Sequence, residues 1–107
     1  MPMVNVRKPM RLQRCLAFNK ALSAQALEGI EYIAIDFDKA KRRMTFFPST
    51  TPMFKGTPAH KLTFDGGGNT IGRVVYLPVK ALTEDDIPTG RYQVLSIGKN
   101  DSFSITF

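Results

Sequence analysis

A spacing that occurs twice constrains this chain more than any other feature of its sequence. The tripeptide Lys-Ala-Leu at 20–22 returns at 80–82, and Tyr32 is matched by Tyr92, so both landmarks are repeated 60 positions later. The segments beyond the tyrosines also correspond, 32–37 with 92–97 and 43–47 with 103–107. Such self-similarity is typical of two copies of one supersecondary unit. Because the identities are few, chance similarity stays as the alternative.

Apolar alternation predicts four strands in each copy. They are expected at 4–6, 14–18, 32–37 and 43–47 in the first copy, and at 60–64, 71–77, 92–97 and 103–107 in the second. In each copy the last two strands are expected to form a hairpin. The glycine-rich stretch 65–69 is expected to be a hairpin loop, because glycine readily adopts the positive φ angles of tight turns.

A short helix is expected between the second and third strands of each copy. Asn19 is a good N-cap for residues 20–28, whose apolar side chains recur at helical spacing, and Gly29 suits the position just after a helix. In the second copy Pro78 suits the first turn of a matching helix. The acidic cluster at 83–86 opposes the helix dipole there and should end that helix early.

These patterns predict a mainly β fold with short helices (α+β), built from two β-β-α-β-β repeats that share one core. Residues 1–107 then form a single domain, made of repeat 1 (about 4–47), a proline-rich connection (48–58) and repeat 2 (about 59–107). A unit of about 45 residues hardly buries enough surface to fold alone. The two copies are therefore expected to depend on each other.

Composition places the chain among soluble globular proteins, with 43% hydrophobic and 22% charged residues. No apolar run is long enough to cross a membrane and no signal peptide is visible. Cys15 is the only cysteine, which excludes an internal disulfide, fits a cytoplasmic location and favours a role in core packing.

No pattern in the sequence indicates catalysis, a metal or a cofactor. His60 is the only histidine, and no serine or cysteine has an evident base partner. Asp36 and Asp38 share one face of a strand but lack a third ligand, so they are expected to be the polar side of that strand. We therefore expect a protein that is not an enzyme.

The net charge of +6 is distributed unevenly. Residues 1–61 hold eleven Lys or Arg against four Asp or Glu, whereas residues 62–107 hold four against five. A one-sided positive field attracts nucleic acid or an acidic protein surface, although many basic proteins have no such partner.

Two basic groups are candidates for contact with a polyanion. The first is Arg7, Lys8, Arg11 and Arg14, on paired strands and their turn, and the second is Lys39, Lys41, Arg42 and Arg43, at the tip of a hairpin. Arginine can bind a phosphate through two parallel hydrogen bonds. The alternative is that both groups are solvated turns, since hairpin tips are often charged.

The stretch from Gly72 to Leu82, followed by a turn at 87–91 and a final hairpin, resembles the AbrB/SpoVT swapped-hairpin domain, whose members typically have a Gly-Arg-Val-Val motif before a proline and a short helix. The resemblance covers 71–107 and, more faintly, 14–47. It implies a duplicated single chain of the MraZ-like kind, folded as a pseudo-twofold swapped-hairpin barrel that binds DNA. It also implies that Arg73 and its counterpart Arg14 contact DNA, together with Arg7 or Lys8 on the preceding strand. The chain departs from the family where Leu82 and Thr83 stand near the places of further arginines.

Two functions follow from the sequence. The first is a transcriptional regulator that contacts duplex DNA through Arg7, Lys8, Arg11, Arg14, Arg73, Lys41, Arg42 and Arg43, mainly from the first repeat. The alternative is an inhibitor or accessory factor, of the sort that phages and mobile elements encode, docking on an acidic protein or nucleoprotein surface. In either case the chain would be a monomeric pseudo-dimer or a homodimer without a cofactor.

Overall fold

The computed structural model describes residues 1–64, 71–80, 82–94, 97–98 and 101–107. Over these residues the chain is mainly β with one short helix, which confirms the expected fold class at that level. The elements in chain order are β1 (Met3–Val6), β2 (Gln13–Asn19), α1 (Lys20–Ala26), β3 (Tyr32–Asp38), β4 (Arg43–Ser49), β5 (Met53–Phe54), β6 (Thr57–Pro58), β7 (His60–Lys61), β8 (Thr63–Phe64), β9 (Ile71–Pro78), β10 (Gly90–Gln93) and β11 (Phe103–Thr106).

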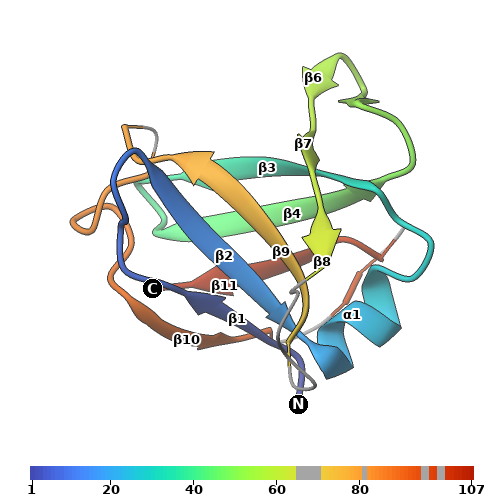
Figure 1. The fold of residues 1–107 in the computed structure, drawn as a ribbon, viewed down its shortest axis with the longest axis horizontal. Coiled ribbons are helices and arrows are strands. Elements are labelled where there is room, and N and C mark those ends of the chain that lie inside the picture. Colours follow the sequence, from blue (N-terminus) through green and yellow to red (C-terminus); the bar gives the residue numbers. More distant parts are fainter. Residues whose placement is uncertain (65–70, 81, 95–96, 99–100) are drawn as a thin grey trace.

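Two sheets carry most of the fold (Figure 1). One has five strands in the order β10-β1-β2-β9-β8, and the other has four in the order β11-β4-β3-β7. The pair β5 and β6 forms a small separate ribbon within the proline-rich segment that the sequence suggested was a plain connection. The helix α1 follows β2 directly and also contacts β9, so it lies at one end of the two sheets.

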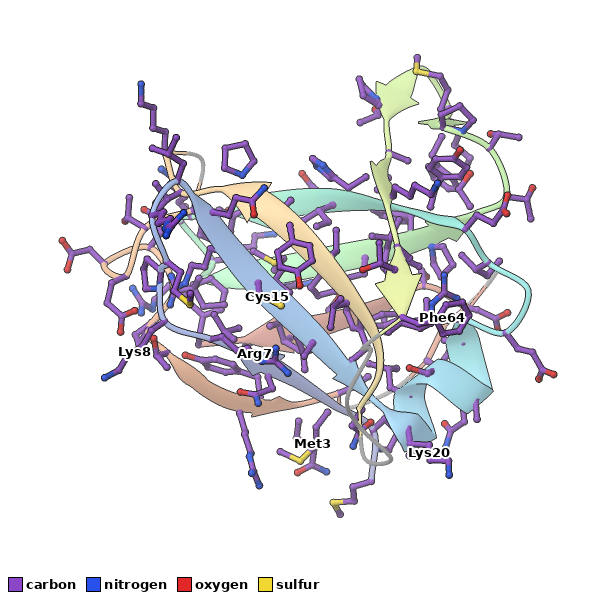
Figure 2. The ribbon with its side chains drawn as sticks, in the orientation of Figure 1. Met3, Arg7, Lys8, Cys15, Lys20 and Phe64 are labelled. Carbon is purple, nitrogen blue, oxygen red and sulfur yellow. The ribbon has the colours of Figure 1, made fainter. Side chains whose placement is uncertain are left out.

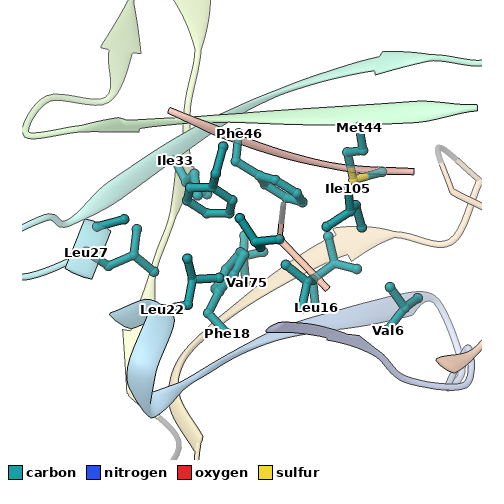
Figure 3. Close-up of a cluster of buried hydrophobic side chains, with 14 of the residues drawn as sticks. Val6, Leu16, Phe18, Leu22, Leu27, Ile33, Met44, Phe46, Val75 and Ile105 are labelled. Carbon is teal, nitrogen blue, oxygen red and sulfur yellow. The ribbon is translucent and has the colours of Figure 1, made fainter. Parts of the chain in front are cut away.

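The hydrophobic core fills the space between the two sheets (Figure 3). Alternate residues of β2, among them Leu16 and Phe18, point inward and are fully buried. The Phe18 ring meets the ring of Phe46 from β4 edge to face at 5.4 Å, and the Phe46 ring stacks on that of Phe103 from β11 at 5.0 Å. Burying a side chain of this size contributes about 1.5–3 kcal/mol, so this aromatic cluster joins the layers firmly.

The helix begins where the sequence indicates. The Asn19 side chain accepts a hydrogen bond from the Leu22 backbone N–H at 3.0 Å, which satisfies one of the unpaired donors of the first turn. The same oxygen accepts from the Met3 N–H at 3.2 Å and ties the helix start to β1. The helix ends at Ala26 with Leu27 as its C-cap, two residues earlier than expected, and Gly29 has the positive φ (73°) expected after a helix end.

Strands from the two halves of the chain pair with each other at four places, one of which is the pair of β4 with β11. The antiparallel ladder of β2 and β9 puts Arg14 opposite Leu77 and Phe18 opposite Arg73. Beyond it, β1 pairs with β10 and β3 pairs with β7, in registers that place Val4 opposite Tyr92 and Lys61 opposite Tyr32. Each tyrosine landmark therefore lies against the first strand of the other half.

Two expectations about the second half are wrong for the residues that the structure describes, and a third is met only in part. The segment after Pro78 forms turns instead of a helix, because Thr83 and Asp86 bond to each other's backbone N–H groups and begin a new turn there. The strand expected at 60–64 is divided at Leu62 between the two sheets. Among the described residues, the expected final hairpin is present only beside its turn, where Ile97 and Phe103 form an antiparallel bridge and the Gly98 N–H donates to the Ser102 carbonyl at 2.7 Å. Further along, β10 pairs with β1 and β11 with β4. The loop expected at 65–69 lies outside the described residues.

Candidate nucleic-acid interface

The hairpin between β1 and β2 ends in a two-residue turn. Met10 and Gln13 exchange backbone hydrogen bonds at 2.9 and 3.0 Å, which leaves Arg11 and Leu12 at the tip. Arg11 adopts φ 54°, in the left-handed region that costs a residue with a Cβ about 1–2 kcal/mol. The turn holds Arg11 and Leu12 out in solvent, and the Leu12 side chain is 76% exposed.

A surface hollow of about 600 Å³ lies beside this turn, on the outer face of the five-stranded sheet. It is lined by Arg7, Lys8, Met10, Arg11, Leu12, Gln13, Cys15 and Tyr76. Tyr76 of β9 lies opposite Cys15 of β2, and the Arg7 guanidinium lies 3.8 Å from the Cys15 sulfur. Figure 2 shows Arg7 and Cys15 close together beside the middle of β2, with Lys8 toward the left edge of the view. We refer to this surface as the hairpin hollow.

The lining of the hairpin hollow combines positive charge with exposed apolar surface. Arg7, Lys8 and Arg11 contribute cations, and none of the lining residues that the structure describes is acidic. Met10 and Leu12 are among the most exposed large hydrophobic residues, and Tyr76 is 48% exposed. The hollow thus offers charge-assisted hydrogen bonds together with an aromatic ring and apolar side chains.

Acidic residues lie at the border of this surface. The Glu84 carboxylate forms an ion pair with Arg14 at 2.8 Å and accepts hydrogen bonds from the Thr89 N–H and hydroxyl. These Thr89 hydrogen bonds are the main reason that the pKa of the Glu84 carboxyl is lowered, and the charges of Arg14 and Lys8 add to the effect. Glu84 therefore stays ionised and limits the positive surface on that side.

The structure places Arg14 in the interior, so the expectation that it contacts DNA is wrong. Its side chain is fully buried, and its guanidinium donates to the carbonyls of Arg7 (3.0 Å) and Thr83 (2.6 Å) as well as to Glu84. These bonds join the first hairpin to the turn at 83–89. Arg14 holds the fold together and presents no donor to a partner.

Arg73 is also buried, at 7% exposure, and the expected DNA contact is wrong for it too. Its guanidinium donates to the Leu27 carbonyl at 3.2 Å and the Leu62 carbonyl at 3.5 Å, and it lies 4.3 Å from the centre of the Phe64 ring. The sequence held a signal for both arginines. Strand alternation puts Arg14 on the face of Leu16 and Arg73 on the face of Val75, which are both inward faces.

The second basic group is partly engaged within the protein. Lys39 pairs with Asp86 at 3.4 Å, and Arg42 donates to the Phe107 carbonyl at 2.6 Å while its guanidinium lies over the Phe107 ring. Lys41 and Arg43 are exposed. The turn that carries them lies at the same end of the molecule as the β1–β2 turn (Figure 1). The acidic segment 84–86 reduces the positive charge there, because Glu84 pairs with Arg14 of the first basic group and Asp86 pairs with Lys39 of the second.

Comparison with family models, curated proteins and solved structures finds no match. The candidate interface therefore rests on the geometry of this chain. Among the described residues, no helix has the length and apolar character needed to span a membrane. The sequence analysis did not predict that Met10, Leu12 and Tyr76 belong to the interface. A signal was available for the first two, because large apolar residues stand on either side of Arg11 in a turn, where polar residues are usual.

Proposed function

We propose that this chain is a small, non-enzymatic cytoplasmic protein that binds duplex DNA, as a regulator does, through Arg7, Lys8 and Arg11 of the hairpin hollow. The observation that carries the proposal is that the described residues of the lining include three cations and no acidic residue. Cations that neutralise phosphates release condensed counterions, which drives binding and makes it sensitive to salt. Phosphate contact of this kind positions a protein on DNA without reading sequence.

We further infer that the two copies are related by a pseudo-twofold axis in a swapped-hairpin arrangement, as the resemblance to the AbrB/SpoVT domain implies. The pairing of β1 with β10 and of β3 with β7 supports this inference, because each copy lends a strand to the other. Since Arg14 and Arg73 are buried, we expect DNA contact to be lopsided and dominated by the first copy. Lys41 and Arg43 would add a weaker, peripheral contribution.

Fluorescence anisotropy of a mixed-sequence duplex, titrated from about 50 to 200 mM salt, tests the proposal. We expect micromolar binding that weakens steeply with salt. Lys8→Ala and Arg11→Ala should each reduce the slope of log K against log salt by about 1, as loss of one phosphate contact does. Lys61→Ala is the matched control, because Lys61 is an exposed lysine on β7 outside the hollow. Absence of binding at the lowest salt, or equal losses for Lys8→Ala and Lys61→Ala, would reject the proposal.

A second candidate function is docking on an acidic protein surface. The exposed Met10, Leu12 and Tyr76 favour it, since apolar anchors beside arginine are characteristic of protein interfaces. The double variant Met10→Ser, Leu12→Ser separates the two functions, because it leaves all three cations in place. Loss of a stoichiometric partner that survives nuclease treatment would favour docking, whereas unchanged DNA affinity with no such partner would favour DNA binding.

A further inference from the structure

The two buried arginines differ in how completely they are bonded. Arg14 donates through Nε to the Arg7 carbonyl, through one terminal nitrogen to the Thr83 carbonyl, and through the other to Glu84. Each nitrogen of its guanidinium thus has an acceptor, and one acceptor is a carboxylate that balances its charge. The cost of burying the Arg14 guanidinium is therefore offset by its hydrogen bonds and by the negative charge of Glu84.

Arg73 occupies the equivalent position in the β2–β9 ladder but lacks that compensation. Its two terminal nitrogens reach only backbone carbonyls, and its buried Nε has no hydrogen-bond partner. Among the residues that the structure describes, no ion pair involves Arg73. Desolvation lowers the pKa of its guanidinium, and the nearby charge of Glu31 offsets this only in part. An unpaired buried donor is costly, so an acceptor that reached the Nε once the exposed Phe64 ring had moved aside would be favoured.

The sequence explains where the missing carboxylate would come from. Glu84 stands two residues after Leu82 in the second Lys-Ala-Leu segment, and Ala24 stands two residues after Leu22 in the first. The carboxylate that compensates Arg14 is therefore replaced by a methyl group near Arg73. Ala24 and Arg73 line the same surface hollow.

A hollow of about 420 Å³ lies where this side chain is missing. Its lining comes from α1, the segment after it, and strands β8 and β9: Lys20, Ser23, Ala24, Leu27, Glu28, Gly29, Phe64, Gly72 and Arg73. Its size lies within the range of small-molecule sites. Phe64, whose ring is 76% exposed and covers the Arg73 guanidinium, supplies an aromatic wall. Figure 2 shows Lys20 and Phe64 at this end of the molecule, away from Lys8.

We propose that this second hollow is a binding site for a small organic carboxylate, whose charged group bonds to Arg73 and whose apolar body lies against Phe64 and Leu27. Lys20 supplies a further cation to the lining, and Glu28 disfavours ligands with several negative charges. The site shares no lining residue with the hairpin hollow, so it does not depend on the proposed DNA binding. Neither the charge distribution nor any sequence motif predicts such a small-molecule ligand.

The test uses benzoate as the probe and benzamide as its neutral counterpart, in NMR titrations of the full chain. We expect benzoate to shift the Arg73 Nε–H and Gly72 amide signals in a saturable way, at concentrations up to about 20 mM, which covers the millimolar Kd expected of a ligand this small. Benzamide should produce less than a tenth of that shift. Inorganic phosphate at equal ionic strength tests whether any anion suffices, and a response to phosphate equal to that of benzoate would overturn the assignment to carboxylates.

Ala24→Glu supplies the carboxylate from within the chain and keeps Arg73 intact. In this variant the Arg73 Nε–H signal should already be shifted without ligand, the response to benzoate should be lost, and the Tm should rise. Ala24→Gln, of the same size but neutral, should keep most of the benzoate response. The inference fails if benzoate gives no saturable shift in the natural chain, or if the response in Ala24→Glu equals that in Ala24→Gln.

Discussion

At the scale of single residues, position along a strand decides what an arginine does. Arg11 and Arg14 belong to the same hairpin, yet Arg11 lies exposed in the turn and Arg14 is fully buried. A buried guanidinium must find an acceptor for each of its nitrogens, so Arg14 is committed to the carbonyls and the carboxylate around it. Only the exposed arginine is available to a partner.

Arg14→Met should therefore lower the free energy of unfolding by about 1–3 kcal/mol, because the carbonyls of Arg7 and Thr83 lose their donor, while the Glu84 carboxylate, which is half exposed, stays hydrated. Arg11→Met should change it by less than about 0.5 kcal/mol, as is usual for exposed positions. Urea denaturation of both variants checks this. Similar midpoints for the two would mean that the bonds of Arg14 contribute little.

At the scale of elements, hydrogen bonds between neighbouring residues explain why the second copy has no counterpart of α1 among its described residues. Thr83 and Asp86 bond to each other's backbone N–H groups, and Glu84 accepts two bonds from Thr89. In α1, by contrast, Asn19 caps the segment, and its short polar residue Ser23 donates to the Phe18 carbonyl instead of accepting from a backbone N–H. Short polar side chains offer the backbone an alternative to the helix, and in the second copy that alternative prevails.

The carboxylates of this turn predict how stability depends on pH. The pKa values of Glu84 and Asp86 lie below their ordinary values of 4.5 and 3.8, chiefly because of hydrogen bonds from Thr89 and Thr83 respectively. The unfolded chain then binds more protons at acidic pH, so this stability is present above pH 4.5 and is lost as pH falls through the lowered folded pKa values. Glu84→Gln should make Tm depend less on pH in that acidic window. Parallel Tm curves for the variant and the natural chain would contradict the role given to Glu84.

At the scale of the whole molecule, the two halves complete each other's sheets. The β1 strand is bounded by β2 on one side and by β10 from the other half, and β7 from the second half pairs with β3. The core cluster likewise mixes Phe18 and Phe46 with Phe103. Neither half has a closed core of its own, because the inward faces of its strands are covered by strands of the other.

Separate fragments 1–56 and 57–107 should therefore be unfolded, and an equimolar mixture should regain β structure. The break at Gly56 lies in the turn of the β5–β6 ribbon, outside both main sheets. Circular dichroism of each fragment and of the mixture measures this. A fragment that folds cooperatively alone would show that the copies are independent units.

The sequence by itself determined the local elements. Alternating apolar residues located most strands, and Asn19 marked the start of α1. These features depend on interactions between residues close in the chain. Periodicity and capping chemistry therefore predict them directly.

Only the tertiary structure decided which strands pair and where each charge lies. The pairing of β10 with β1 joins residues far apart in sequence, and no local signal distinguishes that partner from the hairpin that we expected. Strand alternation places Arg14 on an inward face, but only the fold reveals the acceptors around it, which are the carbonyls of Arg7 and Thr83 and the carboxylate of Glu84. The physical reason is that burying a charge is favourable only when acceptors from distant segments converge on it, and such convergence is a property of the folded chain.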